Sequence, residues 1–411
     1  LGGKTCSATG IAFNCIDDPV NFKMDGTYGG NFDGFIAKFT TSGEVIRSTY
    51  VGGLSLDYIL GITTYLDAAG NVYLFAAGSG EGATGIVVPS YTGVEQYTYS
   101  GGDKDHGDVI LLKFNGDLSQ RIWGTYYGSA GGQERGHELI VDNNGNLYVV
   151  GTMSQNFDGL AKGDKIYQSV KGGIGDAFLS RWTQDGKLTW LTFYGGPAYD
   201  RGRDVQTDRQ GNIYIAGKTT AALSYPNAFA SSPDVAKSTS QIDSDLDGYV
   251  AKFNSNGGLI WGSFFGGSGY DDIRTINVDP SGAPIYICGY TTSEDLPVTD
   301  DAYDKVRKGG DFYFAKLNFN ATRILYCTYY GGKGNEGVAA YVNRLPNSIG
   351  YVEYAYVKQN KMIYTLMKNR EGHFVAPDDE TFKAAAAGAD WKKSFYQLIT
   401  DQPGKDAWPI S

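Results

Sequence analysis

Residues 175–219 read GDAFLSRWTQDGKLTWLTFYGGPAYDRGRDVQTDRQGNIYIAGKT, and this stretch decides the fold because its pattern recurs along most of the chain. Each copy has an Asp, a short apolar run, a Gly turn, a run ending in an aromatic residue and Gly, an acidic residue, and an apolar run. Further copies begin at Asp33, Asp108, Asp247 and Asp311. The spacing of about 64 to 75 residues is long enough for four strands and their loops.

Strand alternation is clearest in the last part of each copy, around a tyrosine, at residues 72–74, 147–149, 213–215 and 285–287. An Asp precedes each of these runs. In Asp67, Asp142 and Asp208 the carboxylate can accept backbone N–H groups, and a following Gly supplies the positive φ that closes a hairpin. The copy at 279–284 carries an insertion and is expected to bulge.

Four antiparallel strands in each repeated unit predict an all-β fold, a β-propeller whose units are blades. Residues 1–332 form this predicted domain, with blades at about 8–51, 57–127, 136–194, 202–265 and 271–330. The first strand of each blade is expected to be innermost, because bulky residues such as Trp190 lie on the fourth strands. The first blade is the least regular, since residues 26–30 replace a recognisable second strand. Long loops at 79–107 and 221–246 are expected on one rim, where binding usually resides.

The repeated units resemble the bacterial SBBP-type β-propeller repeat over about residues 33–332. The residues that carry the resemblance are 176–178, 247–253, 125–128 and 208–214. It implies a secreted or cell-surface bacterial protein, with adhesion as a role of the family, and it transfers no catalytic residues.

The pattern changes near residue 331. Residues 331–411, including 384–391 and 401–404, are similar to the C-terminal part of the periplasmic phosphate-binding protein of phosphate ABC transporters. The resemblance implies an α/β fragment over 333–411. The phosphate-holding Arg-x-x-x-Ser-Gly-Thr segment of that family has no counterpart here. Such a change of pattern within one chain indicates a chimera.

Composition narrows the classes of partner. The chain carries a net charge of −10, with no cluster of Lys and Arg along the sequence, so a nucleic-acid backbone is not an expected partner. No apolar run approaches the roughly 20 residues that cross a bilayer. The opening Leu-Gly-Gly resembles the end of an earlier repeat, so a signal peptide or further repeats are expected upstream. A secreted or cell-surface location is predicted, with the periplasm as the alternative.

Two sets of residues are candidates for binding. Asp243, Asp245 and Asp247 have the Asp-x-Asp-x-Asp-Gly spacing of calcium loops, although position 12 would be Asn254 instead of Glu, and the alternative is a solvated acidic turn. The second set follows each Gly-Gly, where it would surround the mouth of the central channel: Asp57, Glu134, His137, Asp200, Arg203, Asp271 and Arg274, with Glu336 in the next copy. Such a set of acids and basic residues could bind a cation or a carboxylated sugar. Alternatively, each acid accepts backbone N–H groups and pairs with its neighbouring Arg.

Catalytic signatures are poor. The histidines, His106, His137 and His373, form no metal-binding pair, and no nucleophile elbow or phosphate loop appears. Trp123, Trp190 and Trp261 recur on fourth strands, where blade-to-blade packing is favoured over sugar stacking.

Three functions remain open at the level of sequence. The preferred one is a non-enzymatic extracellular propeller that binds an unknown ligand, glycan or protein, with calcium as the one cofactor under consideration. A carbohydrate-active propeller enzyme and the phosphate-binding component of an ABC transporter are the alternatives.

The four cysteines permit three pairings. Cys6 and Cys15 could close a small loop. Cys288 and Cys327 belong to the second and fourth strands of one blade, so an intervening strand should hold them nearly 10 Å apart, too far for a disulfide.

Overall fold

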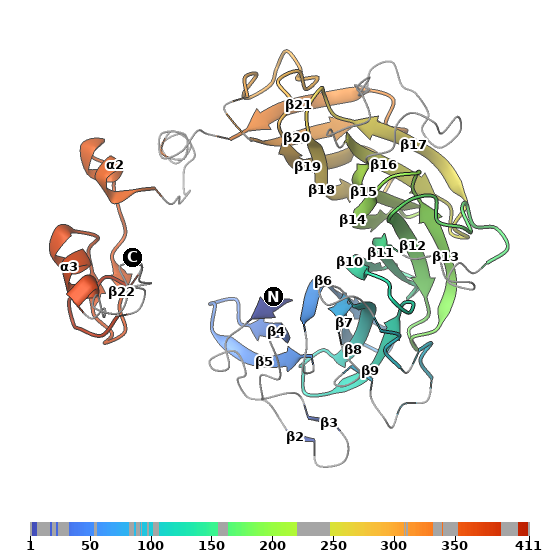
Figure 1. Ribbon diagram of the computed structural model, residues 1–411, viewed down its shortest axis with the longest axis horizontal. Coiled ribbons are helices and arrows are strands. Elements are labelled where there is room, and N and C mark those ends of the chain that lie inside the picture. Colours follow the sequence, from blue (N-terminus) through green and yellow to red (C-terminus); the bar gives the residue numbers. More distant parts are fainter. Residues whose placement is uncertain are drawn as a thin grey trace. The chain divides into compact units, whose positions relative to one another are not determined.

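The computed structural model describes residues 2–5, 17–18, 22–23, 33–52, 56–81, 86–87, 91, 93–96, 98–101, 107–154, 163–219, 247–307, 309, 311–331, 339, 352–387 and 402–409. The chain divides into two compact units, residues 1–330 and 331–411. The first unit consists of antiparallel sheets and has the predicted all-β propeller fold (Figure 1).

Four sheets of the first unit share one plan, in which four strands pair in chain order. Each of these four sheets begins at the first residue expected for its blade or two residues before it. The strands are β6 (Asp57–Leu66), β7 (Val72–Gly80), β8 (Asp108–Asn115) and β9 (Arg121–Tyr127); β10 (Glu134–Val141), β11 (Leu147–Met153), β12 (Asp176–Trp182) and β13 (Leu188–Tyr194); β14 (Asp200–Thr207), β15 (Ile213–Thr219), β16 (Asp247–Phe253) and β17 (Leu259–Phe265); β18 (Asp271–Val278), β19 (Ile285–Thr291), β20 (Asp311–Leu317) and β21 (Ile324–Tyr330). We call these sheets blades two to five.

The first blade differs from the expected order. Its sheet has three described strands, β1 (Gly2–Thr5), β4 (Asp33–Phe39) and β5 (Val45–Val51), in the order β1-β4-β5. β1 pairs with β4, the position that second strands take in the other blades. This long-range pairing places the blade's second strand near residue 2 instead of after residue 8. A separate two-stranded hairpin, β2 (Asp17–Asp18) with β3 (Phe22–Lys23), lies between these segments in sequence.

The first strands of neighbouring blades lie beside one another: β6 beside β10, β10 beside β14, and β14 beside β18. Figure 1 shows these strands along the inner side of the blade array. The prediction that the first strand is innermost is therefore confirmed.

The repeated tryptophans join neighbouring blades. Trp123 donates its indole N–H to the carbonyl of Gln184 at 2.8 Å, and Trp190 donates to the carbonyl of Ser255 at 3.0 Å. Both acceptors belong to the turn between the third and fourth strands of the following blade. Both rings are buried, so blade-to-blade packing of these residues, as the sequence favours, is confirmed.

The turn between the first and second strands forms as the Asp-x-x-Gly-Asn pattern predicts. In blade four, Asp208 Oδ1 accepts the backbone N–H groups of Gln210 and Asn212, at 3.0 and 2.9 Å. Gly211 has a φ of 78°. In blade five the corresponding backbone bond joins Asp279 to Pro284, so that turn is one residue longer, as expected from the insertion.

Each inner strand carries a β-bulge close to its start. The pairing with the second strand shifts by one residue, which leaves an extra residue in each of blades two to five: Leu60, His137, Arg203 and Arg274. A Gly on the second strand faces each bulge. At Gly217 an added Cβ would lie 1.8 Å from the carbonyl oxygen of Arg201, and the equivalent glycines Gly78, Gly151 and Gly289 face the same clash. The bulge therefore requires a residue without a side chain opposite it.

Strand β20 lies between the two cysteines: Cys288 on β19 pairs with Phe314 of β20, and Cys327 on β21 pairs with Ala315 of β20. The predicted intervening strand is confirmed, and both cysteines are free. Cys6 and Cys15 lie outside the described residues.

The second unit contains the helices α2 (Tyr354–Gln359) and α3 (Asp379–Ala387), together with the short hairpin of β22 (Met367–Lys368) and β23 (Phe374–Val375). Asn369 connects two of its segments by donating side-chain N–H groups to the carbonyls of Gly404, Lys405 and Ala407. Trp408 packs edge-on against Phe382, with ring centroids 6.0 Å apart. The fragment thus combines helices and strands, as expected.

Candidate functional site

The acidic residues that begin the inner strands are structural. Asp57, Glu134, Asp200 and Asp271 are at most 2% exposed. Asp200 Oδ2 accepts the backbone N–H of Gly196 at 2.6 Å, and Asp271 Oδ2 accepts that of Gly267 at 2.8 Å. Hydroxyl groups complete the arrangement: Thr219 donates to Asp200, Ser293 to Asp271 and Ser129 to Glu134. These carboxylates close the local backbone at the start of each strand.

The arginines that follow these acids do not pair with them. The expectation that each acid pairs with its neighbouring Arg is therefore wrong. Arg203 binds Asp272 instead, through Nε–Oδ1 and Nη2–Oδ2 contacts of 3.3 and 2.8 Å. Arg274 also approaches Asp272, with its Nε 2.9 Å from Oδ2. Asp272 is fully buried and belongs to the next blade relative to Arg203. One carboxylate therefore holds arginines from two blades.

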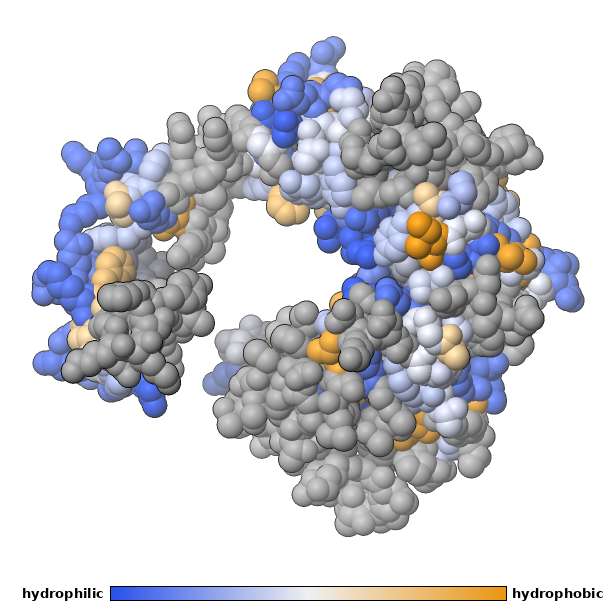
Figure 2. Space-filling model, in the orientation of Figure 1, coloured by the Kyte–Doolittle hydropathy of each residue, from blue (hydrophilic) through white to orange (hydrophobic). Residues whose placement is uncertain are grey.

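Arg203, Arg274 and Lys218 approach this carboxylate, and further basic side chains lie on the adjacent inner strands β10 and β14. We define the cationic cluster as Arg135, His137, Arg201, Arg203, Lys218, Arg274 and Asp272. Figure 2 shows strongly hydrophilic residues at the inner side of the blade array, where Figure 1 places β10, β14 and β18. The β-bulges contribute His137, Arg203 and Arg274. Asp272 is the single carboxylate among five arginine and lysine side chains.

Two arginines of the cluster have no carboxylate partner in the described part of the chain. Arg135 packs over the ring of Tyr58, with its guanidinium carbon 5.7 Å from the ring centroid, and its buried Nε has no hydrogen-bond partner there. Arg201 donates from Nε to the hydroxyl of Tyr199 at 3.1 Å. Burial, followed by the charges of Arg201 and Arg203, lowers the pKa of Arg135. Positive charge in this region thus exceeds the negative charge that faces it.

Lys218 lies on the second strand directly opposite Arg201. It donates to the hydroxyl of Tyr270 at 2.7 Å, and its Nζ is 4.0 Å from Asp272 Oδ2. Burial lowers the pKa of Lys218 to about 8, even though Asp272 acts in the opposite direction. The neighbouring arginines contribute to this decrease, so the lysine experiences the same excess of positive charge.

The positive charge of the cluster also acts on His137. Its Nε2 is buried and has no hydrogen-bond partner among the described residues. Burial and then the charges of Arg203, Arg201, Arg135 and Arg274 hold the pKa of His137 well below 6.5. The imidazole is therefore neutral at neutral pH, with a polar nitrogen enclosed among arginines.

Two further inner-strand acids are also engaged. Asp204 Oδ2 accepts from the hydroxyl of Thr275 at 2.6 Å and from the backbone N–H of Ile276 at 2.8 Å, which links blade four to blade five. Glu138 accepts the backbone N–H of Leu139 at 3.0 Å, and burial raises the pKa of Glu138 to about 7. Asp204 thus holds two neighbouring inner strands together, whereas Glu138 is bound within its own strand.

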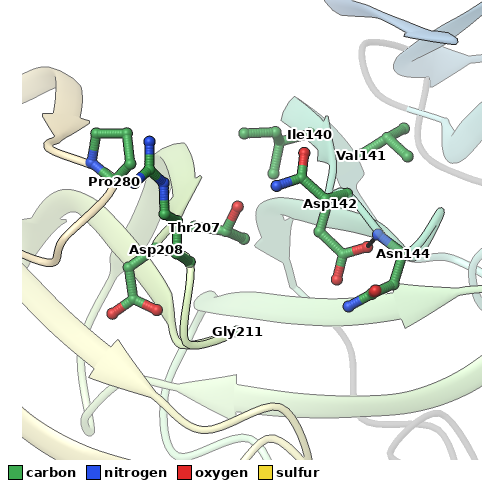
Figure 3. Close-up of a pocket in the computed structure, with 10 residues that line it drawn as sticks. Ile140, Val141, Asp142, Asn144, Thr207, Asp208, Gly211 and Pro280 are labelled. Atoms are coloured by element: carbon green, nitrogen blue, oxygen red, sulfur yellow. Dashed lines mark hydrogen bonds between the residues drawn. The ribbon is translucent and has the colours of Figure 1, made fainter.

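A separate pocket of about 340 Å³ lies at the other end of the inner strands, among the turns of blades three to five. Figure 3 shows Asp142 and Asn144 on one side, with Thr207, Asp208 and Pro280 on the other. Asp142 and Asp208 are already bound to their own turns, Asp142 by Asn144 and Asn146, and Asp208 by Gln210 and Asn212. Their carboxylates are thus committed to the backbone.

For calcium, Asp243 and Asp245 lie outside the described residues, and Asp247 begins β16, where it pairs in register with Thr219. Within the described ranges, no group of three or more His, Cys, Asp or Glu side chains is arranged to hold a metal. The helices in those ranges are all too short or too polar to span a membrane.

Comparison with known proteins supports both predicted resemblances. The SBBP beta-propeller repeat matches residues 122–157 and 189–223. Over 83 residues the chain is 55% identical to the phosphate-binding protein PstS of Xylella fastidiosa, which covers 20% of this chain and 23% of that protein. It is 49% identical over 90 residues to PstS of Pasteurella multocida, covering 21% and 26%. The chain thus spans about a quarter of the length of these curated relatives.

A solved structure is also similar, that of a protein of unknown function from Dyadobacter fermentans. It is 9% identical, has a TM-score of 0.35, and the match covers 71% of this chain and 69% of the other.

Sequence reasoning identified His137, Arg203 and Arg274 but not Arg135, Arg201, Lys218 or Asp272. Arg135 and Arg201 each directly follow the acid of the inner strand, in the segments ERGH at 134–137 and DRGR at 200–203. An Arg beside an acid suggests a local ion pair. The repeated acid-Arg-Gly-basic pattern was the signal that could have indicated convergent cations.

Proposed function

We propose that the propeller unit is a non-enzymatic binding module that engages its ligand at the inner strands of blades three to five. The observation that carries this proposal is the division of roles within those strands. Asp200, Asp204 and Asp271 are committed to backbone and hydroxyl groups, and Asp272 is committed to Arg203 and Arg274. Arg135 and Arg201, in contrast, have no carboxylate partner among the described residues. Charged groups of one sign on a rigid scaffold attract ligands of the other sign.

The same division argues against a carbohydrate-active enzyme. Glycoside hydrolysis requires two carboxyl groups that can reach one bond of the substrate, one as acid and one as base or nucleophile. Asp200 and Asp271 each bind a separate stretch of backbone on a separate blade. Neither carboxylate is left to act on a substrate, so the proposal is one of binding.

We place this module outside the cytoplasm, secreted or at the cell surface, with the periplasm as the alternative. The repeat matches and the similarity of one segment to phosphate-binding proteins support this location. Phosphate uptake is not proposed, because the shared segment spans about a quarter of those relatives. Fractionation of cells that express the protein tests the location; recovery in the cytoplasm alone would contradict it.

Retention of the chain on a panel of immobilised polysaccharides and extracellular proteins tests the function, together with chromatography of each soluble ligand before and after incubation. We expect retention on at least one ligand, which is recovered with unchanged length. Loss of the ligand into shorter products would contradict the non-enzymatic assignment. Absence of retention on every ligand would contradict binding.

A further inference from the structure

We propose that the cationic cluster is a binding site for an acidic saccharide, with Arg135 and Arg201 holding the carboxylate of the sugar. The inference rests on the proposed binding function and names the class of ligand.

The excess of positive charge in the cationic cluster favours an anionic ligand. Asp272 is the sole carboxylate in contact with Arg203 and Arg274, and Arg135 and Arg201 have none among the described residues. Glu134, the buried acid next to Arg135 in sequence, does not offset this charge. Burial raises the pKa of Glu134 to about 8, so its carboxyl is mostly protonated at neutral pH. A planar guanidinium matches the two oxygens of a carboxylate, which makes Arg the usual residue for this recognition.

The cations differ in their access to solvent. Lys218 and Arg203 are 11% and 13% exposed in their side chains, and they form the floor of the cluster with Asp272. Arg274 is 50% exposed, and Arg135 and Arg201 are half-buried. Arg274 is therefore the cation most open to a ligand, and Arg135 and Arg201 fall in the same range of partial exposure as Arg203.

Tyrosine rings beside the cations favour a sugar over a small inorganic anion. Tyr58, Tyr199 and Tyr270 are half-buried, and each ring lies within 6 Å of a cationic group: 5.7 Å for Arg135, 5.3 Å for Arg201 and 4.9 Å for Lys218. Aromatic faces offer apolar area together with a hydroxyl, which suits a ring that is apolar on one face and polar at its edge. A free phosphate would use the arginines without the rings.

Calorimetry on the full chain tests the inference with three probes: an oligogalacturonate, the methyl ester of the same oligosaccharide, and inorganic phosphate. The variants are Arg135→Gln and Arg201→Gln. Arg209→Gln is the matched control, because Arg209 is an exposed arginine in the turn that follows the inner strand of Arg201 and lines the separate pocket. Thermal melts establish that each variant is folded, and Arg201→Lys tests whether charge alone suffices.

We expect oligogalacturonate to bind the unaltered chain and the control equally. Each of the two cluster variants should weaken binding at least about tenfold, the effect of losing one charged hydrogen bond, and the ester should not bind. Equal binding of acid and ester would overturn the inference, as would loss of binding in Arg209→Gln alone, which would assign the ligand to the pocket. Binding of phosphate alone, lost in both cluster variants, would overturn the saccharide class. In each of these cases retention on another ligand would leave the proposed binding function standing.

Discussion

Glu134 begins the inner strand of blade three with its carboxyl fully buried, and its Oε1 accepts a hydrogen bond of 3.0 Å from Ser129. Burial raises its pKa from 4.5 to about 8. Below pH of about 4.5 the group is protonated in both the folded and the unfolded chain. As the pH rises from there to about 8, the unfolded chain ionises first, so the folded state loses stability across this window.

Replacement of Glu134 by Gln should remove this pH dependence, because the amide does not ionise. Relative to the unaltered chain, the variant should gain on the order of 2 kcal/mol in the free energy of unfolding between pH 5 and pH 8. Urea unfolding at several pH values measures the difference. Glu44→Gln, at an exposed turn position, controls for the loss of one negative charge. A difference between Glu134→Gln and the unaltered chain that is constant over this range would refute the account of Glu134.

At the scale of the element, the β-bulge near the start of each inner strand is the feature that positions the cationic cluster. The bulge turns the extra residue out of the regular alternation and brings the preceding carbonyl close to the second strand. Gly217 meets the carbonyl of Arg201 in this way. A methyl group there must push the two strands apart.

Gly217→Ala should therefore destabilise the chain by more than about 3 kcal/mol, at the upper end of the cost of overpacking. Gly211→Ala in the same blade is the matched comparison. Gly211 has open space around its Cβ position and a φ of 78°, so this change should cost only about 1 to 2 kcal/mol of backbone strain. Urea unfolding of both variants measures the difference. Equal losses would show that the bulge tolerates a side chain.

The strands themselves could be predicted from sequence, because their signals are local. Asp208, Gly211 and Asn212 define a hairpin within five residues, and the repeat then transfers that turn to the other blades. Two features depended on distant pairing instead. The first blade takes its second strand from residues 2–5, and the partnership of Arg203 with Asp272 spans 69 residues between two blades. No local pattern encodes either contact.

On the scale of the whole molecule, charge is unevenly distributed. The chain carries a net charge of −10, yet two arginines of inner strands and Lys218 of a second strand approach one carboxylate, Asp272. The overall negative charge of the chain repels an anion at a distance. The attraction of the cationic cluster therefore takes effect only once the anion is close. We therefore expect binding of an acidic ligand to weaken as salt is added.

Calcium remains a proposal for the segment with Asp243, Asp245 and Asp247. If these carboxylates converge on one ion, addition of a chelator should lower the melting temperature and calcium should restore it. The comparison protein is the triple variant with Asn at all three positions, whose melting temperature should not respond to chelator. A chelator effect equal in both proteins, or absent from both, would contradict a calcium site in this segment.

The most direct test of the central claim is the titration of His137 by nuclear magnetic resonance, with the signal assigned through a His137→Gln variant. Burial and then the charges of arginines on three strands lower the pKa of this imidazole, and an anion bound among the arginines should offset their charge. We predict that His137 stays neutral to well below pH 6.5 without ligand, and that its pKa rises when oligogalacturonate is added at constant ionic strength. A pKa near 6.5 without ligand, or one that does not respond to the oligosaccharide, would contradict an anion site at the inner strands.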